Sequence, residues 1–105
     1  MPLQIDKENS SDRYVVSVHG EVDLYSSPEL REVLTGNLPS GVGSVCVDLS
    51  GVPYMDSSGV ATLVEGLRAA KAASVTFVVV APSAQVRKVL ELSRLDSVFE
   101  IRDAL

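Results

Sequence analysis

The chain has 105 residues, of which 46% are hydrophobic and 5% aromatic, and its formal net charge is −5. This length suits one domain with a single, mainly aliphatic core. The acidic balance argues against binding to nucleic acid or to an anionic membrane surface, because both attract basic proteins. No apolar run is long enough to span a bilayer, and the N-terminus lacks the features of a signal peptide. We therefore expect a cytoplasmic protein with one domain over residues 1–105.

Few residues in this chain suit metal or redox chemistry. Cys46 is the only cysteine, which excludes an internal disulfide or a cysteine zinc cluster, and we interpret it as a packing residue. The carboxylates of Glu21, Asp23 and Asp56 match no metal-ligand spacing, and surface or capping roles are commoner for such residues. Neither glycine-rich phosphate-binding motif occurs. We expect no metal and no cofactor.

Two strands are expected at the start of the chain. Residues 3–6 suit a short edge strand, and residues 14–19 show the alternation of a half-buried strand. The polar residues 8–12 between them predict a turn, so the two strands should form a hairpin.

A helix is expected next, beginning near Ser26 or Ser27. Pro28 suits the first helical position, which favours Ser27 as the N-cap, although Ser26 and Glu29 have the spacing of a capping box. Residues 39–41 should end this helix. The apolar residues of its buried stripe are Leu30, Val33, Leu34 and Leu38.

The second half of the chain continues the alternation of strands and helices. Strands are expected at 44–49 and 75–81, the latter being the most apolar and therefore central or covered on both faces. Helices are expected at about 57–72 and after residue 83, followed by a short fifth strand near Ile101. The residues expected to face the core are Val60, Leu63, Val64, Leu67 and Ala70 in the first of these helices and Val86, Val89 and Leu90 in the second. This order predicts an α/β fold: a mixed four- to five-stranded sheet with helices mainly on one face.

The stretch at 48–71 organises the rest of the chain. It comprises a strand end, a tight loop and an amphipathic helix, which places the loop at the carboxyl end of the sheet, where open α/β folds carry their sites. Asp56, Ser57 and Ser58 can each cap this helix. On residue chemistry alone, capping is the favoured interpretation of the three.

Ser57 and Ser58 are also candidates for a serine nucleophile. A nucleophile elbow needs a glycine shortly before the serine, but residues 54–56 are Tyr, Met and Asp. The only histidine, His19, closes the second strand, where a structural role is much commoner than that of a catalytic base. A small serine hydrolase is therefore the least favoured alternative.

A family resemblance favours a functional role for these serines over simple helix capping. Asp-Leu-Ser-Gly-Val at 48–52, followed by Met-Asp-Ser-Ser-Gly-Val at 55–60, resembles the signature of the STAS-domain anti-sigma factor antagonists. Gly-Glu-Val-Asp at 20–23 resembles the turn after the second strand of that family, and the element order agrees over nearly the whole chain. The resemblance implies a single STAS-like domain that is not an enzyme. It also implies a switch, in which the unmodified protein binds a partner that is both an anti-sigma factor and an ATP-dependent serine kinase. Phosphorylation of the motif serine abolishes this binding, and a separate serine phosphatase reverses it.

By motif position, the resemblance makes Ser57 the phosphoacceptor. Helical periodicity disagrees in part, because it places Ser58 nearly opposite the apolar stripe, so that exposure alone favours Ser58. If Ser57 is the cap, however, its hydroxyl lies outside the regular helix, where a phosphate can meet the free amides of the first turn. We therefore favour Ser57. Partner contacts are expected from residues at the same end of the sheet: Asp23, Leu24, Tyr25, Asp56, Ser58, Ser83 and Val86.

The resemblance leaves the partner open. The chain ends at Leu105, so the C-terminal helix usual in the family is expected to be short or missing. The family also includes stressosome components and subunits of lipid-transporting ABC systems. The main alternative is therefore a constitutive STAS subunit docked on a transporter ATPase, with Ser57 merely a helix cap.

Overall fold

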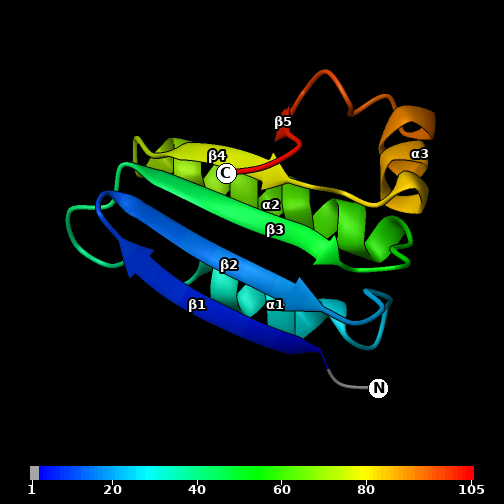
Figure 1. Cartoon of the computed structure of the whole chain (residues 1–105), viewed down its shortest axis with the longest axis horizontal. Helices are drawn as coiled ribbons and strands as arrows, with labels where there is room; N and C mark the ends of the chain where they lie inside the picture. Colours follow the sequence, from blue (N-terminus) through cyan, green and yellow to red (C-terminus); the bar gives the residue numbers. More distant parts are fainter. Residues whose placement is uncertain (1–2) are drawn as a thin grey trace.

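The chain folds around a mixed sheet of five strands (Figure 1). The computed structural model describes residues 3–105, and the strands lie in the sheet in sequence order. The first two strands are antiparallel, and the other neighbours are parallel. The elements are β1 (Gln4–Ser10), β2 (Arg13–His19), α1 (Ser27–Thr35), β3 (Ser44–Gly51), α2 (Ser57–Ala72), β4 (Thr76–Val80), α3 (Ala84–Leu92) and β5 (Glu100–Arg102). The predicted fold class is confirmed.

The expected hairpin is present, but its first strand is longer than predicted. β1 pairs with β2 along its whole length, from Gln4 opposite His19 to Ser10 opposite Arg13. The turn is therefore shorter than the predicted 8–12 segment, and Ser11 in it has a left-handed backbone with φ of 57°. β1 is an edge strand with mostly exposed side chains, so polar residues extend it without disturbing the core.

The start of α1 agrees with the second capping alternative in its position but not in its hydrogen bonds. The N-cap position is occupied by Ser26 rather than Ser27, and Pro28 is the second helical residue. The Ser26 side chain does not cap the helix, because its Oγ instead donates to the carbonyl oxygen of Glu21 at 2.8 Å. The predicted capping box with Glu29 is therefore not formed.

The end of α1 comes earlier than predicted. The last helical residue is Thr35, and Gly36 follows it with an extended backbone. Leu30 and Leu34 fill the buried stripe as expected. Leu38 lies beyond the helix, yet it still packs against the core as a partly buried residue.

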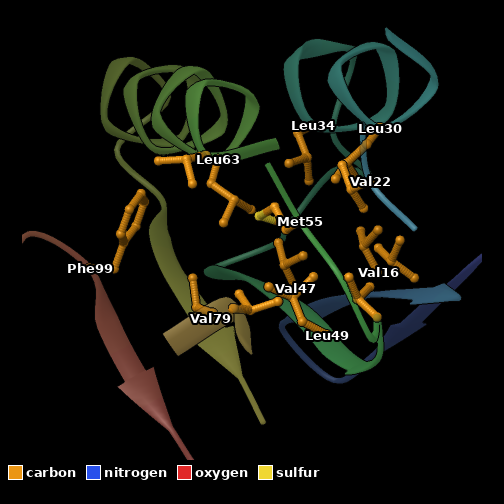
Figure 2. Packing of buried hydrophobic residues seen from close by; sticks show 14 of the residues in the cluster. Val16, Val22, Leu30, Leu34, Val47, Leu49, Met55, Leu63, Val79 and Phe99 are labelled. Carbon is orange, nitrogen blue, oxygen red and sulfur yellow. The ribbon is translucent and has the colours of Figure 1, made fainter. Parts of the chain in front are cut away.

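The helices α1 and α2 pack against each other on one face of the sheet (Figure 1). The main core lies between them and the strands, as Figure 2 shows for Leu34, Leu63 and Val47. At Gly66 the backbone of α2 comes so close to its neighbours that an added Cβ would lie 2.9 Å from Phe77 Cε1 and 3.0 Å from Leu34 Cδ1. The predicted placement of helices mainly on one face is confirmed.

The strand expected to be central is β4, which lies between β3 and β5. Phe77 and Val79 belong to the core under the helices. Val78 and Val80 form a smaller cluster with Cys46 on the other face of the sheet. Both faces of β4 are thus buried, and Cys46 is a buried packing residue as predicted.

The third helix and the last strand follow the expected order. Val86 and Leu90 of α3 are buried, and β5 pairs in parallel with β4. Residues 103–105 after β5 are not helical. No helix within residues 3–105 combines the length and the apolar character needed to cross a bilayer.

Candidate functional site

Two loops at the carboxyl end of the sheet are joined by a short parallel bridge between Val22 and Met55. The Val22 amide donates to the carbonyl oxygen of Tyr54 at 3.0 Å, and the Asp56 amide donates to the carbonyl oxygen of Val22 at 3.1 Å. Val22 and Met55 are fully buried, and both point into the core in Figure 2. The bridge places Asp23, which follows Val22, beside the segment that begins α2. We call this pair of residues the Val22–Met55 bridge.

Asp56, rather than Ser57, is the N-cap of α2. Its backbone is extended, with φ of −101° and ψ of −171°, and its side chain accepts a hydrogen bond from the Ser58 amide at 2.9 Å. The predicted bounds of α2 are confirmed, so Ser57 is its first helical residue. The hypothesis that Ser57 caps the helix is wrong, because the carboxylate one residue earlier already satisfies a free amide of the first turn.

The two serines of the motif differ in exposure. Ser57 is exposed and Ser58 is partly buried, the reverse of what helical periodicity favoured. The carbonyl oxygen of Ser58 also accepts a hydrogen bond from the buried hydroxyl of Thr62 at 3.0 Å. Periodicity fails here because the first turn of α2 packs on the Val22–Met55 bridge as well as on the sheet.

Steric contacts explain why the last residue of the motif, Gly59, is a glycine. A Cβ at this position would overlap Met55 Cγ and would lie 2.9 Å from Val22 Cγ1. Glycine therefore allows the first turn of α2 to lie directly on the bridge. In Asp-Ser-Ser-Gly, Asp56 caps the helix, Ser57 is presented to solvent, and Gly59 seats the helix on the loop below it.

Asp23 organises the loop between β2 and α1. Its Oδ1 accepts hydrogen bonds from the backbone amides of Tyr25 and Ser26, both at 2.9 Å, and from Ser26 Oγ at 3.1 Å. These bonds, above all that from the Ser26 amide, lower the pKa of the Asp23 carboxyl below its ordinary value, because they favour the charged form. The loop therefore holds a carboxylate in a fixed position.

Large apolar side chains are exposed around these polar groups. Leu24 is 66% exposed and Tyr25 is 90% exposed, on the loop that Asp23 organises. Tyr54, on the loop bridged to it, is 43% exposed, and no sequence pattern indicated a role for it. Exposed aromatic and aliphatic groups beside charged ones are typical of surfaces that bind other proteins.

The remaining two predicted contact residues belong to the start of α3. Ser83 is partly buried and caps this helix, because its Oγ accepts from the Val86 amide at 3.3 Å. Val86 is fully buried within the core. Its side chain faces inward although it lies at the correct end of the sheet, so we leave Val86 out of the candidate surface.

Gln85, which no sequence pattern singled out, reaches the motif loop from α3. Its Oε1 accepts from the Met55 amide at 2.9 Å, and its Nε2 donates to the Met55 carbonyl oxygen at 3.0 Å. These partners are 30 residues apart, so only the folded chain brings them together.

A groove of about 520 Å³ includes Ser57 in its wall. Part of its lining is apolar, which extends the candidate surface from Ser57 along the outer side of α2. Its other lining residues are Arg31, Val60, Ala61, Val64, Glu65, Arg68, Ser93 and Leu95.

The structure places the only histidine away from a catalytic arrangement. His19 Nε2 lies 3.6 Å from a carboxylate oxygen of Asp6, on the neighbouring strand β1. Among residues 3–105, no three His, Cys, Asp or Glu side chains gather closely enough to hold a metal ion. What the geometry offers is an exposed serine hydroxyl on a rigid frame, flanked by carboxylates and exposed apolar groups.

Comparisons with known proteins agree with this description. The family model described as "Mlab, STAS domain" matches residues 5–102. An anti-sigma-B factor antagonist of Staphylococcus aureus (strain NCTC 8325 / PS 47) is 31% identical over 103 residues, which cover 98% of this chain and 95% of that protein. An anti-sigma factor antagonist from Mycobacterium paratuberculosis has a similar structure, with a TM-score of 0.83 and 25% identity over 98% of this chain and 87% of that one. The phosphorylated form of the Bacillus cell fate determinant SpoIIAA has a TM-score of 0.69 and 23% identity, over 94% of this chain and 89% of that one. The chain belongs to the STAS-domain anti-sigma factor antagonist family.

Proposed function

We propose that this chain is an anti-sigma factor antagonist, a non-enzymatic binding module that phosphorylation controls. In its unmodified form, it binds an anti-sigma factor that is also an ATP-dependent serine kinase, and phosphorylation of Ser57 ends the binding. A separate serine phosphatase restores it. The observation that carries this proposal is the exposed position of Ser57 on the capped first turn of α2. The relatives named anti-sigma-B factor antagonists support the class of partner. We also propose a cytoplasmic protein with one STAS domain over residues 1–105, which the family match over residues 5–102 supports.

The proposed partner surface surrounds Ser57. Leu24 and Tyr25 supply exposed apolar area whose burial stabilises a complex by roughly 25 cal/mol per Å². The carboxylate of Asp23 is held in place by its loop and is available to a basic residue of the partner. The other residues of this surface are Tyr54, Asp56, Ser58 and Ser83.

The switch follows from the charge of the phosphate. Phosphorylation adds about −1.5 to −2 charges and strong acceptor oxygens. At the start of α2 the helix dipole favours this charge by roughly 0.3–1 kcal/mol, so the fold should persist, as it does in phosphorylated SpoIIAA. A partner packed against the hydroxyl would instead meet a hydrated dianion beside Asp56. Losing one desolvated polar contact costs about 1–3 kcal/mol, which already weakens binding by roughly one to two orders of magnitude.

The test is affinity purification from the native cytoplasm with wild type, Ser57→Ala and Ser57→Asp as baits. Wild type should recover an ATP-dependent serine kinase, Ser57→Ala should recover it less well, and Ser57→Asp should recover little. Ser10→Asp is a matched control, because it adds the same charge on the exposed edge strand, at the end of β1 that pairs with the start of β2. Equal recovery of the kinase by Ser57→Asp and by wild type would show that Ser57 lies outside the interface.

A second candidate function is that of a constitutive STAS subunit of a lipid-transporting ABC system. The description "Mlab, STAS domain" of the matching family model favours it. Here Ser57 would serve only as the first residue of α2. The same experiment separates the two candidates, because the baits would then recover transporter components, and Ser57→Asp would not reduce that recovery.

A further inference from the structure

Met55 occupies the segment immediately before Asp56, and its backbone is held from two sides. On one side, the flanking peptide groups pair with Val22 across the bridge. On the other side no strand is available, because the pairing of β3 with β4 ends at Asp48 opposite Val80. The Gln85 side chain takes the place of that strand, since its amide both accepts from and donates to the backbone of Met55.

We propose that Gln85 is a positioning residue that fixes how Ser57 is presented to the partner, an inference that rests on the proposed function of Ser57. The path is short: Gln85 holds Met55, Asp56 follows Met55, and the Asp56 carboxylate orients the first turn of α2 through the Ser58 amide. Ser57 lies between the two ends of that last hydrogen bond.

The helix that carries Gln85 is itself firmly held. Ser83 caps α3, and Val86 and Leu90 anchor it in the core with no exposed surface. A contact made from a rigid element positions a neighbouring loop more accurately than one made from another loop. Without Gln85, the buried backbone groups of Met55 would lack hydrogen-bond partners. The segment before Ser57 would then gain conformational freedom, and Ser57 would be presented to the partner less accurately.

Gln85→Met separates positioning from packing. Methionine keeps an unbranched side chain of similar length but removes both hydrogen bonds to Met55. Gln85→Glu keeps the acceptor for the Met55 amide and directs a carboxylate oxygen at the Met55 carbonyl. Lys88→Met is the matched control, because it places the same side chain at an exposed position of the same helix.

The first measurement is amide hydrogen exchange by NMR, at a temperature where every variant is folded. In Gln85→Met and Gln85→Glu, the Asp56 amide, which is bonded to Val22 and not to Gln85, should exchange roughly tenfold faster. The Val47 amide in β3 should be unchanged, and Lys88→Met should behave as wild type. A global loss of stability would accelerate both amides alike. Unchanged exchange at Asp56, or equal acceleration at Asp56 and Val47, would overturn the inference.

The second measurement is phosphorylation of Ser57 by the kinase that the affinity experiment recovers. The kcat/KM for Gln85→Met should fall about tenfold, and that for Lys88→Met should equal that of wild type. If kcat/KM is unchanged while Asp56 exchanges faster, Gln85 restrains the loop but does not present Ser57, and the inference fails. If wild type itself is not phosphorylated, the proposed function fails, whereas exchange at Asp56 still decides whether Gln85 holds the motif.

Discussion

Ser57 and Ser58 carry the same hydroxyl group, and the residue before them gives them different roles. The Asp56 carboxylate occupies the Ser58 amide, so the cap belongs to Asp56. Ser57 is left exposed with no capping duty, and its modification need not disturb the helix. The proposed modification site and the helix cap are therefore different residues.

We predict that the phosphate is carried by Ser57 and not by Ser58. Incubation with the recovered kinase and ATP, followed by fragment mass spectrometry, should find it on Ser57 in wild type and in Ser58→Ala. Ser57→Ala should remain unmodified. Because Ser57 is an exposed helical residue rather than the cap, this substitution should change the free energy of unfolding by less than about 0.5 kcal/mol. Phosphate kept in Ser57→Ala and lost in Ser58→Ala would place the site one residue later.

Asp23 should contribute to stability in a pH-dependent way. Its pKa is lower in the folded chain than in the unfolded chain, because amide donors, led by that of Ser26, stabilise the carboxylate. The contribution is therefore present above the unfolded pKa, about 3.9, and is lost as the pH falls through the lower folded pKa. In urea titrations, wild type should be more stable than Asp23→Ala at pH 7, and the difference should shrink below about pH 4. Asp96→Ala, at an exposed position, is the control, and a difference that stays constant down to pH 2 would contradict the prediction.

At the scale of the elements, the sequence predicted the bounds of a helix or strand where buried apolar residues recur along that segment. The bounds of α2 were predicted because its apolar stripe recurs at helical spacing up to Ala70. The polar residues 7–10, by which β1 extends beyond the predicted strand, carry no such signal, because the strand lies at an exposed edge. Helix caps were predicted only as sets of candidates. Asp56 and Ser26 were among them, but the sequence could not show that Asp56 rather than Ser57 caps α2, or that the Ser26 side chain bonds elsewhere.

The candidate site could be predicted where its residues lie in the motif or in the loops that follow strand ends. Ser57, Asp56 and Asp23 could be placed together because strand ends and loops follow from the order of elements. Tyr54 and Gln85 could not, because their roles depend on where distant segments meet in space. Val86 was assigned two roles: helical spacing predicted that it faces the core, and its position at the carboxyl end of the sheet suggested a partner contact. The structure confirms the core position, which excludes Val86 from the surface.

The close contact of Gly59 in α2 with the Val22–Met55 bridge leads to a prediction about stability. Gly59→Ala should lower the free energy of unfolding by about 1–3 kcal/mol, because the methyl group would overlap Met55. This loss should outweigh the helix propensity of alanine, which favours it over glycine by roughly 1 kcal/mol. Urea denaturation measures the change, with Ser58→Ala as the neighbouring control. A variant more stable than wild type would show that the contact is not tight.

At the scale of the whole molecule, the buried core and the proposed partner surface lie in different parts of the domain. The core is aliphatic and lies between the sheet and α1 and α2 (Figure 2). Three of the exposed large apolar side chains, those of Leu24, Tyr25 and Tyr54, lie on loops at the carboxyl end of the sheet. Phosphorylation at this end would change the formal net charge from −5 to about −7. The change would fall almost entirely on the proposed partner surface.

Two glycines of α2, Gly59 and Gly66, lie where neighbouring side chains leave no room for a Cβ. They are seven residues apart, so the helix meets its neighbours at two points roughly 10 Å apart along its axis. A helix held at two such points cannot slide by a turn or rotate without steric overlap at one of them. These contacts argue against a shift of α2 by one turn as the way in which a change at Ser57 reaches the rest of the chain. The phosphorylated and free forms should have the same backbone conformation. They should differ in the charge at Ser57, and therefore in which molecules can bind there.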